Sequence, residues 1–256
     1  MYSLNVKGIR ERGKREQIFS WCKDKQADIV FLQETFSTGE VEDRWRSMWD
    51  GPIYFSHGSN HSKGVLVLIS PKVEIEITQV LQDIEGRFIF IDCKIEGVRL
   101  ILGNVYFPTR NYENDQLLFL RKLRKILTEI NKNEYPLVVG GDFNMIRNNT
   151  LDYLGQSSQR ISNRFNQEFE TFMEENHLLD IWRTRHPLKR QFTYTKKHPF
   201  MQSRLDYWMI SECLEEMVTE CDIMPSLAPD HHSIFMHLFK ENRQKSGKKD
   251  IFLLEI

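Results

Sequence analysis

Residues 136–144 read Pro-Leu-Val-Val-Gly-Gly-Asp-Phe-Asn, an apolar run that ends in two glycines and two polar residues. The apolar run predicts a buried strand. Gly140 and Gly141 allow an unusual backbone or a close approach of another segment, because they lack a Cβ atom. Asp142 and Asn144 are two residues apart, so on an extended segment they share one face. The stretch therefore predicts a core strand that places two polar side chains at one rim of a sheet.

A helix precedes this strand, and a β-α-β unit opens the chain. The helix is expected over residues 114–133, with one apolar stripe formed by Leu117, Leu120, Leu123, Leu127 and Ile130. At the N-terminus, a short strand over 2–6, a helix over 9–25 and a buried strand over 27–33 follow one another. Helices and strands therefore alternate on both sides of the Gly-Gly-Asp segment.

The remaining segments are richer in strands. The β-rich runs lie at residues 64–69, 73–80, 88–95, 99–106, 191–195, 204–210, 219–224 and 232–239. Further helices are expected over 163–177 and, shorter, over 211–218. Helices interspersed with so many strands predict a layered α/β sandwich built on two sheets.

Composition favours one soluble intracellular domain. A chain of 256 residues with 40% hydrophobic content suffices for one large core, expected over residues 1–239 and followed by a polar tail over 240–256. No apolar stretch approaches a membrane span, and the four cysteines form no CxxC pair, so we expect reduced thiols. Lys and Arg total 35 against 36 Asp and Glu, so any binding of nucleic acid depends on local patches.

Polar residues stand next to one end of each of four predicted strands. These are Asn5, Glu34, the pair Asp142 and Asn144, and the pair Asp230 and His231. Each alone is more typical of a turn, a cap or a surface charge than of catalysis. Together they supply the carboxylates, amides and imidazole that a metal-assisted phosphoryl hydrolase needs.

Two further residues have open interpretations. Asp206 lies inside an apolar strand and needs a partner if it is buried, which is either an imidazolium or the adjacent Arg204. Tyr106 ends another strand, where its ring packs in the core or its phenol reaches a phosphate.

Taken in their order along the chain, these polar motifs resemble those of the endonuclease/exonuclease/phosphatase superfamily, and the resemblance covers roughly residues 2–239. The resemblance rests on Asn-Val-Lys-Gly from Asn5, Leu-Gln-Glu-Thr around Glu34, Tyr-Phe-Pro from Tyr106, Gly-Asp-Phe-Asn, Arg-Leu-Asp-Tyr and Asp-His. It implies a four-layer α/β/β/α sandwich of the DNase I type, with the site at one end of two packed mixed sheets. Arg-Leu-Asp-Tyr-Trp-Met-Ile-Ser and the Trp182 to Tyr194 region look most like endonuclease domains of non-LTR (LINE-type) retrotransposons.

The resemblance implies a Mg²⁺- or Mn²⁺-dependent enzyme that nicks DNA and leaves a 3′-hydroxyl. Glu34, Asn5 and Asp230 would hold the metal ion, Asp142 would activate water, and Asn144, His231 and Tyr106 would contact the phosphate, with Asp206 orienting His231. A reverse transcriptase domain or an element RNA would be partners in a parent protein. We expect a monomer that binds no membrane and acts in the nucleus, where its substrate lies.

Several alternatives stay open. The same motifs are compatible with an AP endonuclease-like repair enzyme, with a phosphatase or phospholipase of the same superfamily, and with an inactive binding module. Lys7 replaces the Asp of AP endonucleases, Thr109 a common Asn, and Pro229 the usual Ser. DNA contacts are expected from basic residues that could equally be solvated surface, namely Arg87, Arg110, Lys189, Arg190, Lys196 and Lys197.

Overall fold

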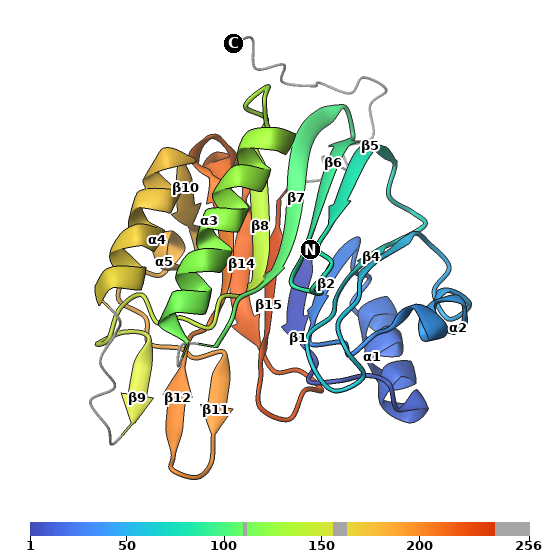
Figure 1. Ribbon diagram of the computed structural model, residues 1–256, viewed down its shortest axis with the longest axis horizontal. Helices are drawn as coiled ribbons and strands as arrows, with labels where there is room; N and C mark the ends of the chain where they lie inside the picture. The colour runs from blue at the N-terminus through green and yellow to red at the C-terminus, as the bar shows by residue number, and fades with distance from the viewer. Residues whose placement is uncertain (110–111, 156–162, 239–256) are drawn as a thin grey trace.

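The computed structural model describes residues 1–109, 112–155 and 163–238, and two six-stranded mixed sheets form its centre (Figure 1). The first sheet has the order β14-β15-β1-β2-β4-β3. Its strands are β1 (Tyr2–Asn5), β2 (Ile29–Gln33), β3 (Ile53–Ser56), β4 (Val65–Ile69), β14 (Glu220–Met224) and β15 (Ser233–His237). The second sheet has the order β10-β13-β8-β7-β6-β5. Its strands are β5 (Ile75–Gln82), β6 (Phe88–Ile95), β7 (Val98–Tyr106), β8 (Leu137–Asp142), β10 (Leu178–Asp180) and β13 (Asp206–Ser211).

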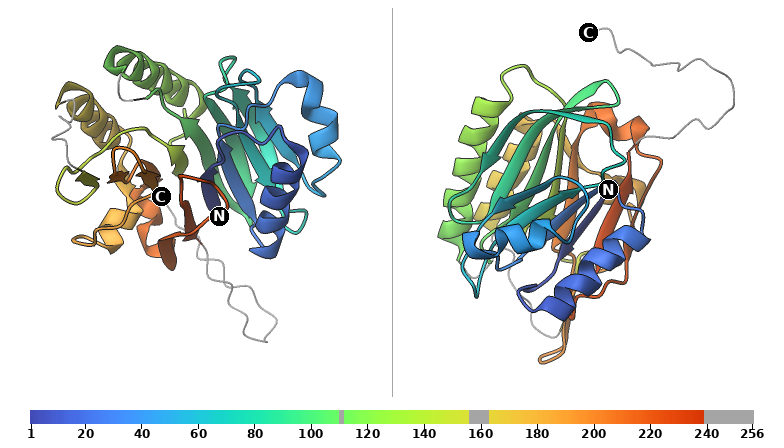
Figure 2. Two further views of the ribbon diagram at one scale, coloured as in Figure 1. Left: turned by 90° about the horizontal axis from the view of Figure 1, so that it is seen from below. Right: turned by 90° about the vertical axis from the view of Figure 1, so that its right-hand side faces the viewer.

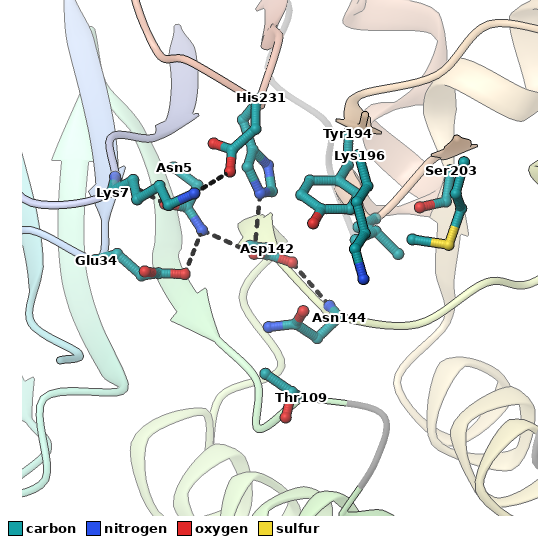
Figure 3. Close-up of a pocket in the computed structure, with 13 residues that line it drawn as sticks. Asn5, Lys7, Glu34, Thr109, Asp142, Asn144, Tyr194, Lys196, Ser203 and His231 are labelled. Atoms are coloured by element: carbon teal, nitrogen blue, oxygen red, sulfur yellow. Dashed lines mark hydrogen bonds and ion pairs between the residues drawn. The ribbon is translucent and has the colours of Figure 1, made fainter. Parts of the chain in front are cut away.

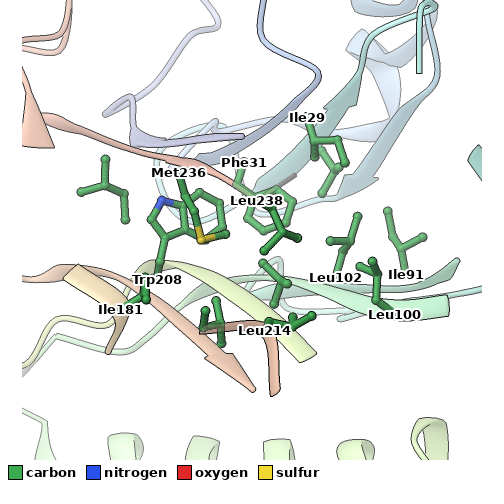
Figure 4. Close-up of a cluster of buried hydrophobic side chains, with 14 of the residues drawn as sticks. Ile29, Phe31, Ile91, Leu100, Leu102, Ile181, Trp208, Leu214, Met236 and Leu238 are labelled. Atoms are coloured by element: carbon green, nitrogen blue, oxygen red, sulfur yellow. The ribbon is translucent and has the colours of Figure 1, made fainter. Parts of the chain in front are cut away.

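The main core lies between the two sheets, and it explains the unbroken apolar runs. Figure 4 shows Phe31 of β2 and Trp208 of β13 meeting between the sheets, with ring centroids 5.4 Å apart. Along β4, Val65 and Val67 belong to this inter-sheet core, whereas Leu66 belongs to the core under the first helix. Because a strand that is covered on both faces buries every side chain, its sequence is apolar throughout instead of alternating.

Helices cover the outer face of each sheet (Figure 2). On the first sheet lie α1 (Arg12–Asp24), the 3-10 turn η1 (Gly39–Val41) and α2 (Glu42–Arg46); on the second lie α3 (Glu113–Ile130) and α4 (Asn163–Glu175). The predicted stripe of α3 is buried, from Leu117 to Ile130, against strands of the second sheet. Two short elements, α5 (Ile181–Arg185) and η2 (Glu212–Met217), complete the helices of the described residues. The expected four-layer α/β/β/α sandwich is confirmed.

A third, small sheet is an unpredicted feature. It has the order β11-β12-β9 and is formed by β9 (Tyr153–Gly155), β11 (Tyr194–Lys196) and β12 (Met201–Ser203), which extend beyond one end of the two main sheets (Figure 1). The sequence predicted a strand at 191–195, which overlaps β11, but it did not predict β9 or β12. Strand β3 was also missed, because its four residues follow a Gly-Pro turn and form no long pattern.

The described helices include none that is long and apolar enough to cross a membrane. All four cysteines are free, and Cys213 is the exposed one. Reduced thiols were expected. The predicted tail, residues 240–256, lies outside the described residues.

Candidate active site

Strand pairing brings the predicted polar residues to one edge of the packed sheets. In the first sheet, β1 and β2 are parallel, with Asn5 paired to Gln33, so that Asn5 and Glu34 leave the sheet together. In the second sheet, β7 and β8 are parallel, and Tyr106 is the register partner of Asp142. Strand β13 runs antiparallel to β8, so its first residue, Asp206, also pairs with Asp142. Carboxyl ends of parallel strands meet at one edge, and an antiparallel neighbour adds its amino end there.

Special backbone conformations turn these side chains toward one another. Glu34 and Asn144 both have positive φ, 51° and 48°, which turns the chain one residue after β2 and two residues after β8. Gly141 has φ 146°, and a Cβ atom there would lie 2.0 Å from the carbonyl oxygen of Val105 on β7. Only glycine therefore lets β8 pack this close to β7 with Asp142 at its end.

A chain of hydrogen bonds links three of these side chains (Figure 3). The Asn5 Nδ2 donates to Glu34 Oε1 and to Asp142 Oδ2, both at 2.9 Å. The Asn144 backbone N–H donates to Asp142 Oδ1 at 2.8 Å, and the Asn144 side-chain amide donates to the carbonyl of Phe107. Both oxygens of Asp142 are thereby held in place, and Asn5 ties the two sheets together at this edge.

His231 is held against Asp206. The distance from His231 Nδ1 to Asp206 Oδ2 is 3.0 Å, and both side chains are buried. The segment that carries His231 is bound to β11 by backbone hydrogen bonds, from Thr195 N–H to Asp230 O and from His232 N–H to Thr193 O. His231 Nε2 then points toward Asp142 Oδ2, 4.0 Å away.

The structure decides between the two partners considered for Asp206. Arg204 is 1% exposed and pairs with two other carboxylates, Asp152 at 2.8 Å and Asp180 at 2.7 Å. The Arg204 guanidinium therefore has its own buried counter-ions, and the partner of Asp206 is the imidazole of His231.

Burial and neighbouring charges shift the acid–base properties of the site. Burial raises the pKa of Asp142 to about 7, and the nearby Asp206 carboxylate adds to this effect. Burial alone would lower the pKa of His231, but Asp206 and Asp142 outweigh it and raise this pKa to about 9. Burial and the carboxylates of Glu34 and Asp142 raise the pKa of Tyr106, so its phenol stays protonated. The site combines a carboxyl group that ionises near neutral pH with an imidazolium.

Comparison with known proteins places this arrangement in a family. Residues 2–226 match the Endonuclease/Exonuclease/phosphatase family. The chain belongs to this family. A transposon TX1 uncharacterized 149 kDa protein of Xenopus laevis is 28% identical over 238 residues, which cover 92% of this chain and 18% of that protein. The chain thus spans less than a fifth of that relative. The similarity agrees with the expected likeness to retrotransposon proteins.

Two further proteins match this chain over most of their own length. An exodeoxyribonuclease of Bacillus subtilis is 22% identical over 251 residues, covering 91% of this chain and 96% of that enzyme. The crystal structure of the Xenopus laevis APE2 catalytic domain superposes with a TM-score of 0.74 at 23% identity, covering 92% of this chain and 91% of that one. The structural likeness confirms the DNase I-like fold.

The site opens into a cavity of about 340 Å³ between the main sheets and the small third sheet (Figure 3). Its lining contains every predicted site residue except Tyr106 and Asp206, which are both buried. The lining residues are Asn5, Lys7, Glu34, Thr109, Asp142, Asn144, Tyr194, Lys196, Met201, Ser203, Leu205, Asp230 and His231. The sequence predicted no place in the site for Tyr194, Met201, Ser203 and Leu205. Met201 and Ser203 lie on β12, which has only three residues and shows no periodic pattern.

Lys7 was predicted as a departure from a motif and not as part of the site. Its Nζ lies 2.5 Å from Asp230 Oδ2. The ammonium group of Lys7 therefore forms part of the cavity wall, next to carboxylates. Its place two residues after Asn5 was the available signal, since a loop that carries one site residue often carries another.

The oxygen-rich side of the cavity fits a hard divalent cation. Glu34, Asp230 and Asn5 would hold such an ion, although Asn5 directs its Nδ2 at the carboxylates and so would offer only Oδ1. Within the described part of the chain, Asp230 Oδ1 is buried without a hydrogen-bond partner, as is Asp206 Oδ1. Asp142, Asp206 and His231 form a second group, with potential ligand atoms all within 4.8 Å of one another.

The predicted basic residues have different surroundings. Lys196 lines the cavity, and Lys197 is exposed on the same hairpin. Arg87 lies over the ring of Tyr106, with Cζ 5.5 Å from its centroid. Lys189 pairs with Asp222, and Arg190 donates to the carbonyl of Tyr153. Arg110 lies outside the described residues.

Proposed function

We propose that the chain is a divalent-metal-dependent endonuclease that nicks DNA by hydrolysis and leaves a 3′-hydroxyl. The observation that carries this proposal is the single linked group formed by Glu34, Asn5 and Asp142 beside the His231–Asp206 pair. Hydrolysis of a phosphodiester needs a positive centre, an oriented water and donors for the charge that develops on oxygen. The group supplies residue types for each requirement.

Asp142 is assigned as the general base. Its Oδ1 accepts from the Asn144 backbone and its Oδ2 from Asn5, so the carboxylate has a fixed orientation. A pKa near 7 matches the proton affinity that a base needs at neutral pH. The 4.0 Å between Asp142 Oδ2 and His231 Nε2 is too long for a direct hydrogen bond, but one shared water or phosphate oxygen could contact both.

His231 is assigned as a donor to the phosphate. Asp206 fixes the ring through Nδ1 and keeps it protonated, which leaves the Nε2–H free to donate into the cavity. A protonated imidazole has no lone pair for a metal ion. We therefore assign the metal ion to Glu34, Asn5 and Asp230 and not to the group of Asp142, Asp206 and His231. Tyr106 and Asn144 would add neutral donors.

A bound Mg²⁺ or Mn²⁺ would supply positive charge that stabilises the phosphate and the leaving 3′-oxygen. Two features support the assignment of ligands. Oxygen is the donor that these ions prefer, and Asp230 Oδ1 is a buried oxygen without a partner among the described residues. Glu34 is only partly buried, so a bound ion could keep several of its waters.

The relatives support DNA as the substrate. The match to a much longer transposon protein supports a role as the nicking domain of a retrotransposon, acting in the nucleus with a reverse transcriptase domain or an element RNA as partner. An AP endonuclease-like repair enzyme is the second candidate, because a superposable structure is that of an APE2 catalytic domain. The presence of Lys7 in place of the Asp found in AP endonucleases favours the first candidate.

One assay separates these functions. Supercoiled plasmid and a duplex with one abasic site are each incubated with the protein in Mg²⁺ or in EDTA. We expect Mg²⁺-dependent nicking of intact plasmid, with ends that a DNA polymerase extends. Cleavage limited to the abasic duplex would support the repair enzyme, and binding without cleavage of either DNA would contradict the proposal.

A further inference from the structure

Two cations line the cavity, Lys7 and Lys196, and the proposed mechanism uses neither. We propose that Lys7 limits divalent-metal binding by pairing with Asp230, so that a metal ion must displace the ammonium to gain this carboxylate as a ligand. The inference rests on the proposed function, because it concerns the same metal site.

The backbone around Lys7 is fixed from three sides. Lys7 has φ 47°, and its N–H donates to Asn5 Oδ1 at 3.0 Å. The next residue, Gly8, donates its N–H to the carbonyl of Glu34. From α1, Lys14 Nζ donates to the carbonyls of Val6 at 2.7 Å and of Lys7 at 2.9 Å. The start of the Lys7 side chain is therefore held at the cavity edge, next to Asn5 and Glu34, two of the three residues that would bind metal.

The Lys7 side chain crosses this edge to Asp230. Its Nζ lies 2.5 Å from Asp230 Oδ2, and the two side chains are 55% and 16% exposed. A lysine side chain is charged at neutral pH, so this contact is an ion pair. One oxygen of Asp230 is thus committed to a cation, while the other, Oδ1, is buried without a partner in the described part of the chain.

Electrostatics gives the direction of the effect. The positive charge of Lys7 beside Asp230 repels an incoming divalent ion and neutralises part of the charge that would attract it. The lysine is long and half exposed, so it can swing away and water screens its charge, which makes the effect moderate. Removing the charge should tighten metal binding by roughly fivefold to fiftyfold.

The test is a titration of the DNA-free protein with Mn²⁺, followed by the loss of the free-ion signal in electron paramagnetic resonance. Lys7→Met removes the charge and keeps much of the length of the side chain, whereas Lys7→Arg keeps the charge. We expect Lys7→Met to lower the Kd for Mn²⁺ by roughly fivefold or more and Lys7→Arg to leave it near that of the wild type. Lys196→Met, which removes a charge from the opposite wall of the same cavity, is the matched control and should change the Kd less.

A double-mutant cycle separates pairing from a general charge effect. If Lys7 acts through Asp230, Lys7→Met should tighten Mn²⁺ binding much less in an Asp230→Asn background than in the wild type. An unchanged or weaker Mn²⁺ affinity in Lys7→Met would overturn the inference. Equal gains in Lys7→Met and Lys196→Met would also overturn it, because they would show an unspecific effect of charge.

Glu34→Gln distinguishes failure of this inference from failure of the proposed function. If Glu34→Gln weakens Mn²⁺ binding and Lys7→Met leaves it unchanged, the metal site stands and only the role of Lys7 is wrong. If Glu34→Gln binds Mn²⁺ as the wild type does, the proposed metal ligands are themselves wrong.

Discussion

Asp142 has a buried carboxylate with both oxygens held by neighbours, and this makes it the most informative single residue. Asn has nearly the same shape, so Asp142→Asn should fold, yet it cannot accept a proton from water. We expect plasmid nicking to fall by about a thousandfold or more, which corresponds to about 4 kcal/mol of transition-state stabilisation.

The matched control for Asp142→Asn is Asp92→Asn. Asp92 is also a buried carboxylate on a strand of the second sheet, but its partner is Arg99 and it lies outside the cavity. The Asp92→Asn variant should keep its nicking activity. Near-normal nicking by purified Asp142→Asn, with an intact fold by circular dichroism, would disprove the role of general base.

The two shifted pKa values predict a pH optimum. Asp142 acts only when ionised, so the rate should rise as the pH increases through its pKa of about 7. His231 acts only when protonated, so the rate should fall as the pH increases through its pKa of about 9. We expect a bell-shaped profile of kcat/KM with its maximum between these values, measured by plasmid nicking at constant Mg²⁺ and ionic strength.

Asp206→Asn tests which residue sets the upper limb of this profile. Without the carboxylate, the burial that lowers the pKa of His231 is opposed mainly by Asp142, so the upper limb should move to lower pH and the maximal rate should drop. An upper limb that stays near pH 9 in Asp206→Asn would show that the His231–Asp206 pair does not control it.

At the level of elements, the close approach of β7 and β8 positions Asp142. Gly141→Ala would place a Cβ atom 2.0 Å from the carbonyl oxygen of Val105 at a φ of 146°, so the two strands would have to separate. We expect a loss of about 2–4 kcal/mol in the free energy of unfolding, measured by urea denaturation. Nicking should fall as well, because Asp142 moves with β8.

Gly39→Ala is the control for this substitution. A Cβ atom at Gly39 meets nothing within 4 Å, and we expect a change in stability within about 0.5 kcal/mol. If Gly141→Ala were as stable as Gly39→Ala, strand packing would not be what requires glycine at this position.

Element prediction succeeded where a segment repeats a pattern and failed where it is short. The α3 stripe and the strands around it follow from apolar residues at helical spacing and from long apolar runs. The strands β9 and β12 have three residues each, which is too few for a period to appear. They are strands because they pair with one another, and this pairing is a tertiary property.

For the whole molecule, the formal net charge of −1 means that DNA must be bound by a local surface. We expect nicking under subsaturating conditions to fall steeply as the salt concentration increases. Lys196→Gln should weaken DNA binding and reduce the slope of log K against log salt by about one, because it removes one phosphate contact. Fluorescence anisotropy with labelled DNA in Ca²⁺ would measure both quantities.

Lys94→Gln serves as the control for the salt experiment. Lys94 lies on β6 opposite Glu76, outside the cavity, and its loss should leave the slope unchanged. Equal slopes for Lys196→Gln and the wild type would exclude Lys196 from the DNA contact surface.

The sequence by itself determined the layered class of the fold and the chemical types of the site residues. Apolar periodicity fixes which faces are buried, and polar residues at the ends of apolar runs are costly in a core, so they indicate a rim. The order of the motifs supplied the family, which the comparison confirmed.

Only the tertiary structure decided which of these residues meet. Asp206 could have paired with Arg204 beside it, but the guanidinium is enclosed with Asp152 and Asp180, and His231 fills the other side. Lys7 and Asp230 are 223 residues apart and touch because β15 pairs with β1 at the edge of the site. Contacts across such separations depend on strand order and register, which the packing of the whole core selects and no local pattern encodes.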